Sequence, residues 1–323
     1  MNNDQMPLAS LLVVFYNQEN FVKDTIRGAL SQTYSNLEII FSDDCSTDGT
    51  FLAIKDAVKY YKGPHRVILN RNESNIGIVP HVNKVLFELS HGEYIFLNGG
   101  DDVSTPNRIK DSLEIMSRLG VDSLSLNMTT INEANEYQKK LFYADTTVEG
   151  VYTIDDYIKG TYKQVPGASR VITRQLLDFY GPFNDDAQTE DTTLNFRALL
   201  YSGLGYSGNI GLEYRVHSSN ISSFSNIYKF FDYNAIHKQY SKDLIIANDK
   251  KKITEKQFSE IKEIIDKWLE IQLLKKDIFQ RKNSVKIFSS IVKILCSNNL
   301  SLSEKKKIFR FVLSCFKFSV RNE

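Results

Sequence analysis

The 323-residue sequence has few residues that crosslink or stiffen a chain, with three cysteines and six prolines. Cys45, Cys296 and Cys315 are odd in number and far apart, so we expect neither a disulfide framework nor a zinc cluster. No apolar run is long enough to cross a bilayer. The opening residues, MNNDQMPLAS, lack the basic and apolar regions of a signal peptide. A reducing cytoplasm is therefore the expected compartment.

Charge is balanced overall but not along the chain. Residues 1–225 contain 19 Lys and Arg against 28 Asp and Glu, whereas residues 226–323 contain 21 against 11. We therefore expect two regions with different roles, the second of which favours an anionic partner. Nucleic acid is not expected as that partner, because the first region is acidic and no recognition motif is present.

The first 120 residues alternate between two hydrophobic patterns. Continuous apolar runs such as LASLLVVFYN and EYIFLN are typical of strands buried on both faces. Segments of helical periodicity lie between them, including PHVNKVLFELS with Pro80 at its start and a helix that ends at Gly120. Repeated βα units predict an α/β fold, Rossmann-like, with a mostly parallel sheet and helices on both faces.

Polar residues gather where three of the predicted strands end. The first strand ends in Phe15, Tyr16 and Asn17 with Glu19 close behind, and the second ends in an Asp43–Asp44 pair. The segment GEYIFLNGGDD ends the fourth strand. Because ligands of such sheets bind beyond the carboxyl ends of the strands, we expect these residues at one edge.

The adjacent carboxylates of Asp101 and Asp102 have two interpretations. They can belong to a solvated turn, or they can bind Mg²⁺ or Mn²⁺, which removes the repulsion between them. Such ions commonly complete their shell with substrate phosphates, and Gly99 and Gly100 would let a diphosphate approach the backbone. The placement of all three clusters after strands of one sheet favours a metal–diphosphate site.

Two further clusters follow later in the chain. Glu190 and Asp191 open a predicted helix, where acidic residues either favour the helix dipole or act as a general base. In the segment YRVHSS, Arg215 and His217 are either structural or contact phosphate or metal.

Residues 7–220 resemble the family-two inverting glycosyltransferases with the GT-A fold, of the bacterial surface-polysaccharide type. The opening block SLLVVFYNQENFVKDTIRGALSQTYSNLEIIFSDDCSTDGT carries the resemblance most strongly. The blocks NIGIVPHVNKVL, GEYIFLNGGDD and TED follow in the expected order. The resemblance implies a metal-dependent enzyme that transfers a hexose from a nucleotide-sugar, with UDP as the expected nucleotide.

The resemblance also implies individual roles. Asp101 matches the metal-binding aspartate, with Asp102 beside it, and His217 matches a histidine that assists the metal or diphosphate. Asp191 matches the general base, with Glu190 next to it. The donor site is expected to contain Phe15, Tyr16, Asn17, Glu19, Asp44, Asn75, Gly100, Asp101 and Arg215, with Asp44 reading the uracil edge.

The sequence departs from the family pattern at two positions. Gly99 stands where the family has the first aspartate of its DxD motif, and Val82 stands where a basic residue often precedes Asn83. Neutralisation of the diphosphate is therefore left to the metal, Lys84, Arg215 or His217. The mechanism implied is direct displacement with inversion, in which an α-linked donor gives a β-linked product.

The basic C-terminal region predicts helices over residues 226–323, after a GT-A domain over residues 1–225. Residues 275–323 carry 12 Lys and Arg against 3 Asp and Glu, and the final helical pattern places Ile308, Phe311, Val312, Cys315 and Phe316 on one face. This face either binds an anionic membrane surface, peripherally on the inner face of the cell membrane, or packs on the rest of the protein.

We therefore expect synthesis of a surface polysaccharide such as O-antigen or capsule, onto a glycan or polyprenyl-diphosphate-linked acceptor. Two alternatives remain at this point. A nucleotidyltransferase also needs a carboxylate-bound metal in an α/β sheet, although its phosphate loop is not seen after the first strand. An inactive nucleotide-sugar-binding scaffold would account for Gly99, whereas the presence of Asp101, Asp191 and His217 argues against it.

Overall fold

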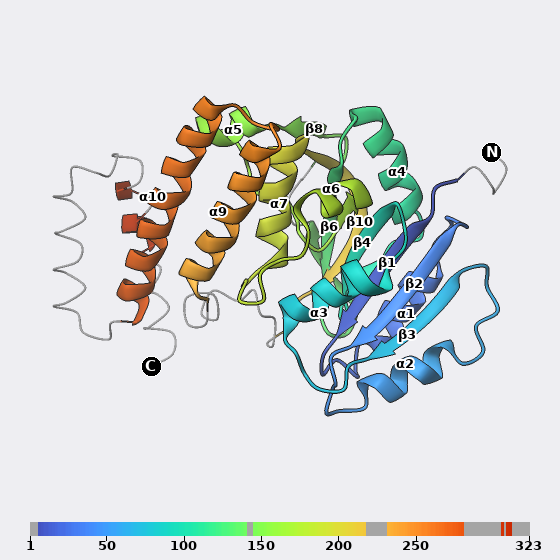
Figure 1. Ribbon diagram of the computed structural model, residues 1–323. Helices are drawn as coiled ribbons and strands as arrows, with labels where there is room; N and C mark the ends of the chain where they lie inside the picture. The colour runs from blue at the N-terminus through green and yellow to red at the C-terminus, as the bar shows by residue number, and fades with distance from the viewer. Residues whose placement is uncertain (1–5, 141–144, 218–230, 281–304, 307, 312–323) are drawn as a thin grey trace.

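A computed structural model of the protein describes residues 6–140, 145–217, 231–280, 305–306 and 308–311. Within these residues, a sheet of ten strands lies at the centre and helices cover both of its faces (Figure 1). Two long helices, α9 and α10, lie side by side on one flank of this layered body (Figure 1). The architecture is the predicted α/β fold with a helical C-terminal extension.

The N-terminal part alternates strands and helices, as the hydrophobic periodicity predicts. Its elements are β1 (Ala9–Phe15), α1 (Val22–Leu30), β2 (Leu37–Asp43), α2 (Thr50–Val58), β3 (Arg66–Arg71), α3 (Ile78–Lys84), a π-helical turn (Val85–Leu89), β4 (Tyr94–Gly99), β5 (Val103–Ser104) and α4 (Arg108–Leu119). Helix α4 ends at Gly120 as expected, and this residue adopts the left-handed conformation with a φ of 66°.

One predicted helix start is wrong by two residues. Helix α3 begins at Ile78, not at Pro80. Pro80 is tolerated inside the first turn because the backbone N–H groups there have no partner within the helix.

The C-terminal part adds antiparallel strands and the remaining helices. Its elements are β6 (Ser123–Ile131), β7 (Tyr137–Lys140), β8 (Glu149–Tyr152), α5 (Ile154–Lys159), β9 (Arg170–Thr173), α6 (Arg174–Tyr180), α7 (Glu190–Tyr201), β10 (Leu204–Arg215), α9 (Tyr233–Asp249) and α10 (Glu255–Gln280).

The sheet is more mixed than the repeated βα pattern predicts. Its main path runs β3-β2-β1-β4-β9-β6-β10-β5, and the first four strands are parallel, as expected. Strand β9 then runs antiparallel to both β4 and β6, and β5, β7 and β8 also pair antiparallel. The short strand β9 lies between two parallel blocks and places the segment before it at the carboxyl end of β4.

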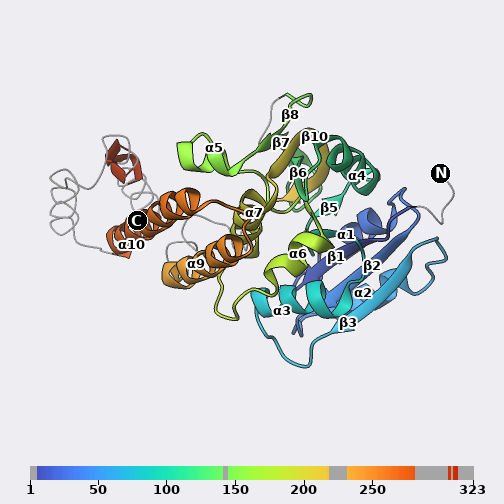
Figure 2. The ribbon, with the colours of Figure 1, turned by 45° about the horizontal axis from the view of Figure 1, so that its top comes forward.

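Two apolar cores lie on opposite faces of the sheet, because alternate strand residues point to opposite sides. Leu12 and Ile40 belong to the core beneath α3, α6 and α7, whereas Leu11 and Ile39 belong to the core beneath α1, α2 and α4. Figure 2 shows α6 and α3 on one side of the strands and α1 and α4 on the other. The prediction of helices on both faces is confirmed.

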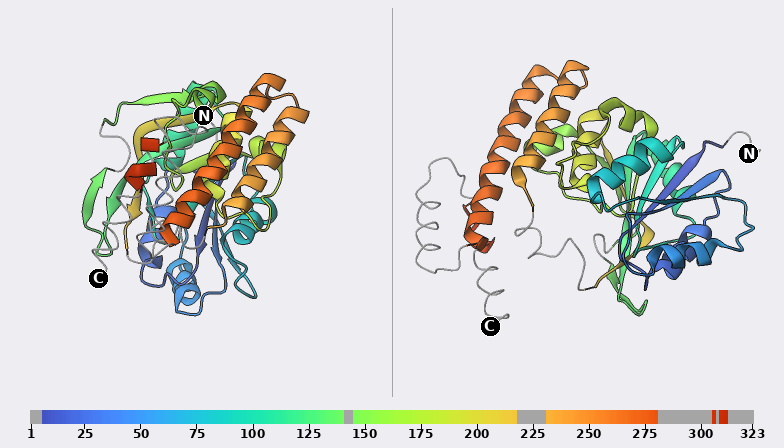
Figure 3. Two further views of the ribbon diagram at one scale, coloured as in Figure 1. Left: turned by 90° about the vertical axis from the view of Figure 1, so that its left-hand side faces the viewer. Right: turned by 60° about the horizontal axis from the view of Figure 1, so that its bottom comes forward.

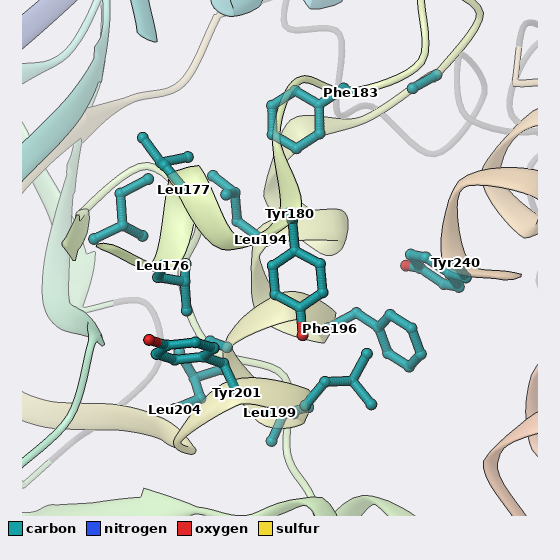
Figure 4. Close-up of a cluster of buried hydrophobic side chains, with 14 of the residues drawn as sticks. Leu176, Leu177, Tyr180, Phe183, Leu194, Phe196, Leu199, Tyr201, Leu204 and Tyr240 are labelled. Carbon is teal, nitrogen blue, oxygen red and sulfur yellow. The ribbon is translucent and has the colours of Figure 1, made fainter. Parts of the chain in front are cut away.

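Helices α9 and α10 extend the first of these cores. Tyr233, Ile236, Tyr240 and Leu244 of α9 are buried in the same cluster as residues of α6 and α7. The ring of Tyr240 stacks on Phe196 of α7 with 4.7 Å between centroids, and the close-up shows both within one aromatic and aliphatic cluster (Figure 4). Figure 3 shows α9 and α10 as a closely packed pair against this part of the fold. Helices α9 and α10 therefore share a core with α6 and with α7, the helix that carries Glu190 and Asp191.

No helix among the described residues combines the length and apolar character needed to span a membrane. Ile308 and Phe311 of the predicted amphipathic face are buried, with 1% and 8% exposure, and Lys275 of α10 lies over the Phe311 ring. The other members of that face, Val312, Cys315 and Phe316, lie outside the described residues.

Candidate active site

The three polar strand ends predicted from the sequence meet at one edge of the sheet. Strand β1 lies between β2 and β4, and the register pairs Phe15 with Asp43 and Val14 with Gly99. The residues that follow these positions therefore leave the sheet at the same level. The expected proximity of the clusters is observed.

The residues after β1 hold the neighbouring turn after β2. Asn17 has a positive φ of 51°, which places its amide beside that turn. Its backbone N–H donates to Ser46 Oγ at 2.9 Å, and its Oδ1 accepts from the Thr47 N–H at 2.9 Å. Tyr16 is 45% exposed at the rim. Tyr16 therefore offers an accessible ring, and Asn17 fixes the loop beside it.

The side chains of Glu19 and Phe15 contact neighbouring backbone segments. The Glu19 carboxylate accepts from the Gly49 N–H at 2.7 Å, next to the start of α2, where a negative charge is favourable. Phe15 is 1% exposed and lies under Gly100, where a Cβ would come within 2.3 Å of the ring. Gly100 is thus required for close packing. The donor-binding roles of these residues stay predictions.

Asp44 organises the loop that leads into α3. Its Oδ1 accepts from Asn72 Nδ2 at 2.8 Å and from the Ile76 N–H at 3.0 Å, and its Oδ2 accepts from the Gly77 N–H at 2.9 Å. Asn75 Oδ1 also accepts from the Gly77 N–H, at 2.9 Å. The structure therefore places Asp44 and Asn75 against the same Gly77 N–H, and their role in base binding stays a prediction.

Asp101 and His217 form a close pair where β4 and β10 end. The Asp101 Oδ2 atom lies 2.8 Å from His217 Nε2, although the residues are 116 positions apart. The His217 ring also packs on Phe21, with 5.0 Å between centroids. Gly99 leaves room for this arrangement, because a Cβ there would lie 2.7 Å from Asp101 Oδ1. Gly99, which stands at the position of the first DxD aspartate, therefore leaves room for the Asp101 carboxylate.

Asp102 and Arg215 support this pair from inside the protein. Asp102 is 2% exposed, and its Oδ1 accepts from the Arg215 N–H at 2.9 Å. Burial and the neighbouring Asp101 carboxylate raise the pKa of Asp102 well above its usual value. The fully buried Arg215 guanidinium donates to the carbonyls of Asp101, at 2.8 Å, and Asn132, at 2.9 Å. These contacts place Arg215 behind the carboxylates, where it fixes the position of Asp101.

The chemistry of the Asp101–His217 pair fits a divalent cation. No three His, Cys, Asp or Glu side chains of the described segments form a group that could hold a metal ion by itself. Mg²⁺ and Mn²⁺, however, are commonly bound through one or two protein ligands together with substrate phosphates. Asp101 and His217 would supply an oxygen and a nitrogen ligand. Asp102, buried and bonded to the backbone, is less available than Asp101.

Glu190 and Asp191 form the first turn of α7, as predicted. Asp191 lies over Gly167, where a Cβ would come within 2.2 Å of its carboxylate carbon. Burial raises the pKa of Asp191, whereas Arg170 acts in the opposite direction. Burial and the Asp191 charge raise the pKa of Glu190 to about 7. The pair is thus a partly buried acidic site able to exchange protons near neutral pH.

Two buried arginines that were not among the predicted site residues hold this region together. Arg108 Nη2 donates to the carbonyls of Leu97, at 2.8 Å, and Ala168, at 3.2 Å. It therefore joins the end of β4 to the segment beneath Asp191. Arg170, at the start of β9, donates from Nη1 to Asn195 Oδ1 at 2.6 Å. No local signal in the sequence marks either residue, because arginine is usually exposed in folded proteins.

The mixed sheet with helices on both faces is a fold of the GT-A type, and sequence comparison identifies the family. The model of Glycosyl transferase family 2 matches residues 10–176, more than half of the chain. The chain belongs to this family.

Two relatives illustrate the similarity. The Bacillus subtilis protein EpsE, assigned as a glycosyltransferase, is 33% identical over 112 residues, which cover 35% of this chain and 39% of EpsE. The Escherichia coli enzyme WfaP, named UDP-Glc:alpha-D-GlcNAc-diphosphoundecaprenol beta-1,3-glucosyltransferase, is 33% identical over 111 residues, which cover 34% of this chain and 42% of WfaP. The matched segment spans less than half of either relative.

Solved structures share the fold over most of the chain. TarS residues 1-349 from S. aureus, in complex with UDP-GlcNAc, superposes with a TM-score of 0.59 at 15% identity, covering 95% of this chain and 79% of that one. The mannosyltransferase PcManGT from Pyrobaculum calidifontis, in complex with GDP-Man and Mn²⁺, has a TM-score of 0.56 at 12% identity, covering 97% and 82%. These likenesses show the GT-A fold.

Proposed function

We propose that this protein is an inverting glycosyltransferase that moves a hexose from a UDP-sugar to a hydroxyl of a glycan or polyprenyl-diphosphate-linked acceptor. The observation that carries the proposal is the pairing of two acidic sites. Asp101 lies against His217, Asp191 lies over Gly167, and Arg108 ties the two underlying segments together. One site suits a diphosphate with its cation, and the other suits a proton transfer.

The residues divide the reaction between them. Asp101 and His217 would hold Mn²⁺ or Mg²⁺, which when bound supplies positive charge to the leaving diphosphate. Asp191 takes the proton of the acceptor hydroxyl while the oxygen forms a bond to the anomeric carbon. The bond from that carbon to the diphosphate breaks, and UDP leaves with the electron pair. Attack opposite the leaving group inverts the anomeric configuration.

Several observations support the remaining parts of the proposal. UDP-GlcNAc is bound in the TarS structure, and WfaP is named for a diphosphoundecaprenol-linked acceptor. Together with family membership, these names favour a UDP donor and a role in surface polysaccharide synthesis. We also propose that residues 1–225 form the glycosyltransferase domain and that the basic region over residues 226–323 contacts an anionic membrane surface on the cytoplasmic side.

Calorimetric binding of UDP, with and without Mn²⁺, tests the donor site. The wild type is expected to bind UDP in a Mn²⁺-dependent manner, and Asp101→Ala is expected to lose this dependence, because it removes the carboxylate paired with His217. Asp56→Ala, which alters an exposed carboxylate on α2, is the matched control and should bind as the wild type does.

The other outcomes are equally informative. Tight UDP binding without metal would overturn the metal part of the proposal. No UDP binding under either condition would overturn the donor assignment. It would favour either a donor with another nucleotide or a role as an inactive scaffold. Once a donor is found, the anomeric configuration of the product tests inversion directly.

A further inference from the structure

The buried Arg170 side chain has no role in the proposed donor site, and it lies close to the acidic pair. It is 1% exposed, at the start of β9. Its Nη1 atom donates to Asn195 Oδ1 at 2.6 Å, while Nε and Nη2 are buried without a hydrogen-bond partner in the described parts of the chain. A buried cation with only one hydrogen bond is costly unless negative charge lies nearby.

That negative charge comes from the first turn of α7. Asn195 follows Asp191 by four residues, so both lie on the same face of the helix. The guanidinium that holds Asn195 is thereby directed to the face that carries Asp191. The Asp191 carboxylate is confined from the other side by the backbone at Gly167. Asp191 thus lies against Gly167, on the helix face that Arg170 reaches through Asn195.

Few other groups compete for this cation. The charged and titratable side chains that act on Arg170 are Asp191 and Glu190 of α7 and Tyr162 of the segment before β9. Burial raises the pKa of Tyr162 to about 12, so this phenol is neutral at physiological pH. Burial lowers the pKa of Arg170, but Asp191 counteracts that effect. The interaction that remains is between one buried cation and two adjacent acids.

We propose that Arg170 is a positioning residue of the base, a buried cation that orients Asp191 and keeps it ionised beside Glu190. This inference rests on the proposed function, in which Asp191 accepts the proton of the acceptor hydroxyl. Without Arg170, two neighbouring acids in a partly buried site would share a proton, and Asp191 would be a poorer acceptor at neutral pH.

The test is the pH profile of kcat/KM for Arg170→Gln and Arg170→Lys. Gln keeps an amide donor but carries no charge, so the acidic limb should move upward by about 1 to 3 pH units. Lys keeps the charge, and its profile should stay close to that of the wild type. Arg118→Gln, which removes an exposed arginine paired with Glu149, is the control and should leave the limb unchanged.

A second readout does not depend on turnover. Carbon-13 labelling of aspartate carboxylates, with Asp191→Asn to identify the resonance, follows the titration of Asp191 directly. Its midpoint should rise in Arg170→Gln and remain near the wild-type value in Arg170→Lys. Arg170→Met provides a second uncharged variant of similar length if Arg170→Gln does not fold.

The outcomes separate the two proposals. Equal losses of activity in the Gln and Lys variants, with unchanged acidic limb and carboxylate midpoint, would overturn the positioning role while leaving the glycosyltransferase function intact. A wild type without transfer activity toward any UDP-sugar would overturn the function, whereas the carboxylate titration would still report whether Arg170 controls Asp191.

Discussion

At Gly167 the backbone passes so close to Asp191 that a Cβ would lie 2.2 Å from the carboxylate carbon. The φ of Gly167 is not in the left-handed region, so an alanine there would clash with the Asp191 carboxylate without straining the backbone. We therefore expect Gly167→Ala to lower the free energy of unfolding by roughly 1–3 kcal/mol and to displace the base. Denaturant unfolding measures the first effect, and transfer activity at constant UDP affinity measures the second.

A double-mutant cycle shows whether the carboxylate is responsible. In an Asp191→Ala background the obstacle is gone, so Gly167→Ala should cost nothing or stabilise the protein by about 0.4–1 kcal/mol through the unfolded state. The same cost in both backgrounds would mean that another contact at Gly167 dominates.

The acidic residues of the candidate site could be predicted from the sequence, whereas the buried arginines that hold them in place could not. Asp101, Asp191 and Glu190 could be located because acids at strand ends and helix starts are visible in a sequence. Arg108 and Arg170 could not, because arginine is usually exposed and only the folded chain shows that both are buried. Arg215 was noticed, but its burial behind Asp101 depends on contacts with distant backbone carbonyls.

Among the secondary-structure elements, α7 and α9 are joined by a fully buried ion pair. Arg197 Nε and Nη2 lie 2.9 and 3.0 Å from the two carboxylate oxygens of Asp243. Removal of one partner leaves an uncompensated buried charge. We therefore expect Arg197→Met or Asp243→Leu alone to lower the free energy of unfolding by about 3–5 kcal/mol, and the double replacement to cost much less.

The exposed pair between Lys238 and Asp186 is the matched control, since it also links the α7 side of the fold to α9. Its atoms are 2.9 Å apart, but the side chains are 66% and 52% exposed. Lys238→Ala should change the free energy of unfolding by at most about 1 kcal/mol. Similar effects at the buried and exposed pairs would contradict this account of how α9 is held.

The boundaries of most elements follow from local periodicity, while the sheet order does not. Strands β1 and β2 coincide with continuous apolar runs, and α4 ends at Gly120, a residue type that commonly terminates helices. Both kinds of element can therefore be predicted from the sequence. The four residues of β9 have no local signal for their insertion between β4 and β6, because their pairing depends on strands from elsewhere in the chain. The resemblance to a GT-A family predicted the fold class, but not the antiparallel insertion of β9 between β4 and β6.

At the scale of the whole molecule, helices α9 and α10 are joined to α6 and α7 by a common apolar core. Tyr240 of α9 stacks on Phe196 of α7, and Ile261 and Ile265 of α10 belong to the same cluster. Each such side chain contributes roughly 1.5–3 kcal/mol when fully buried. A truncation after Asn226 would therefore disturb the fold together with any membrane contact, so charge variants of the intact chain are the better test.

Reversal of three basic charges near the C-terminus tests the proposed membrane contact. Each Lys or Arg near an anionic surface contributes about 1 kcal/mol, so Lys305→Glu, Lys306→Glu and Arg310→Glu together should weaken binding to phosphatidylserine vesicles at least about 100-fold. Vesicle flotation at low and high salt measures this, since added salt screens the attraction. The triple reversal of Lys55, Lys59 and Lys62, exposed near α2, changes net charge equally and should leave flotation unchanged. If both triple variants float as the wild type does, the buried Ile308 and Phe311 indicate instead that the C-terminal region packs on α10.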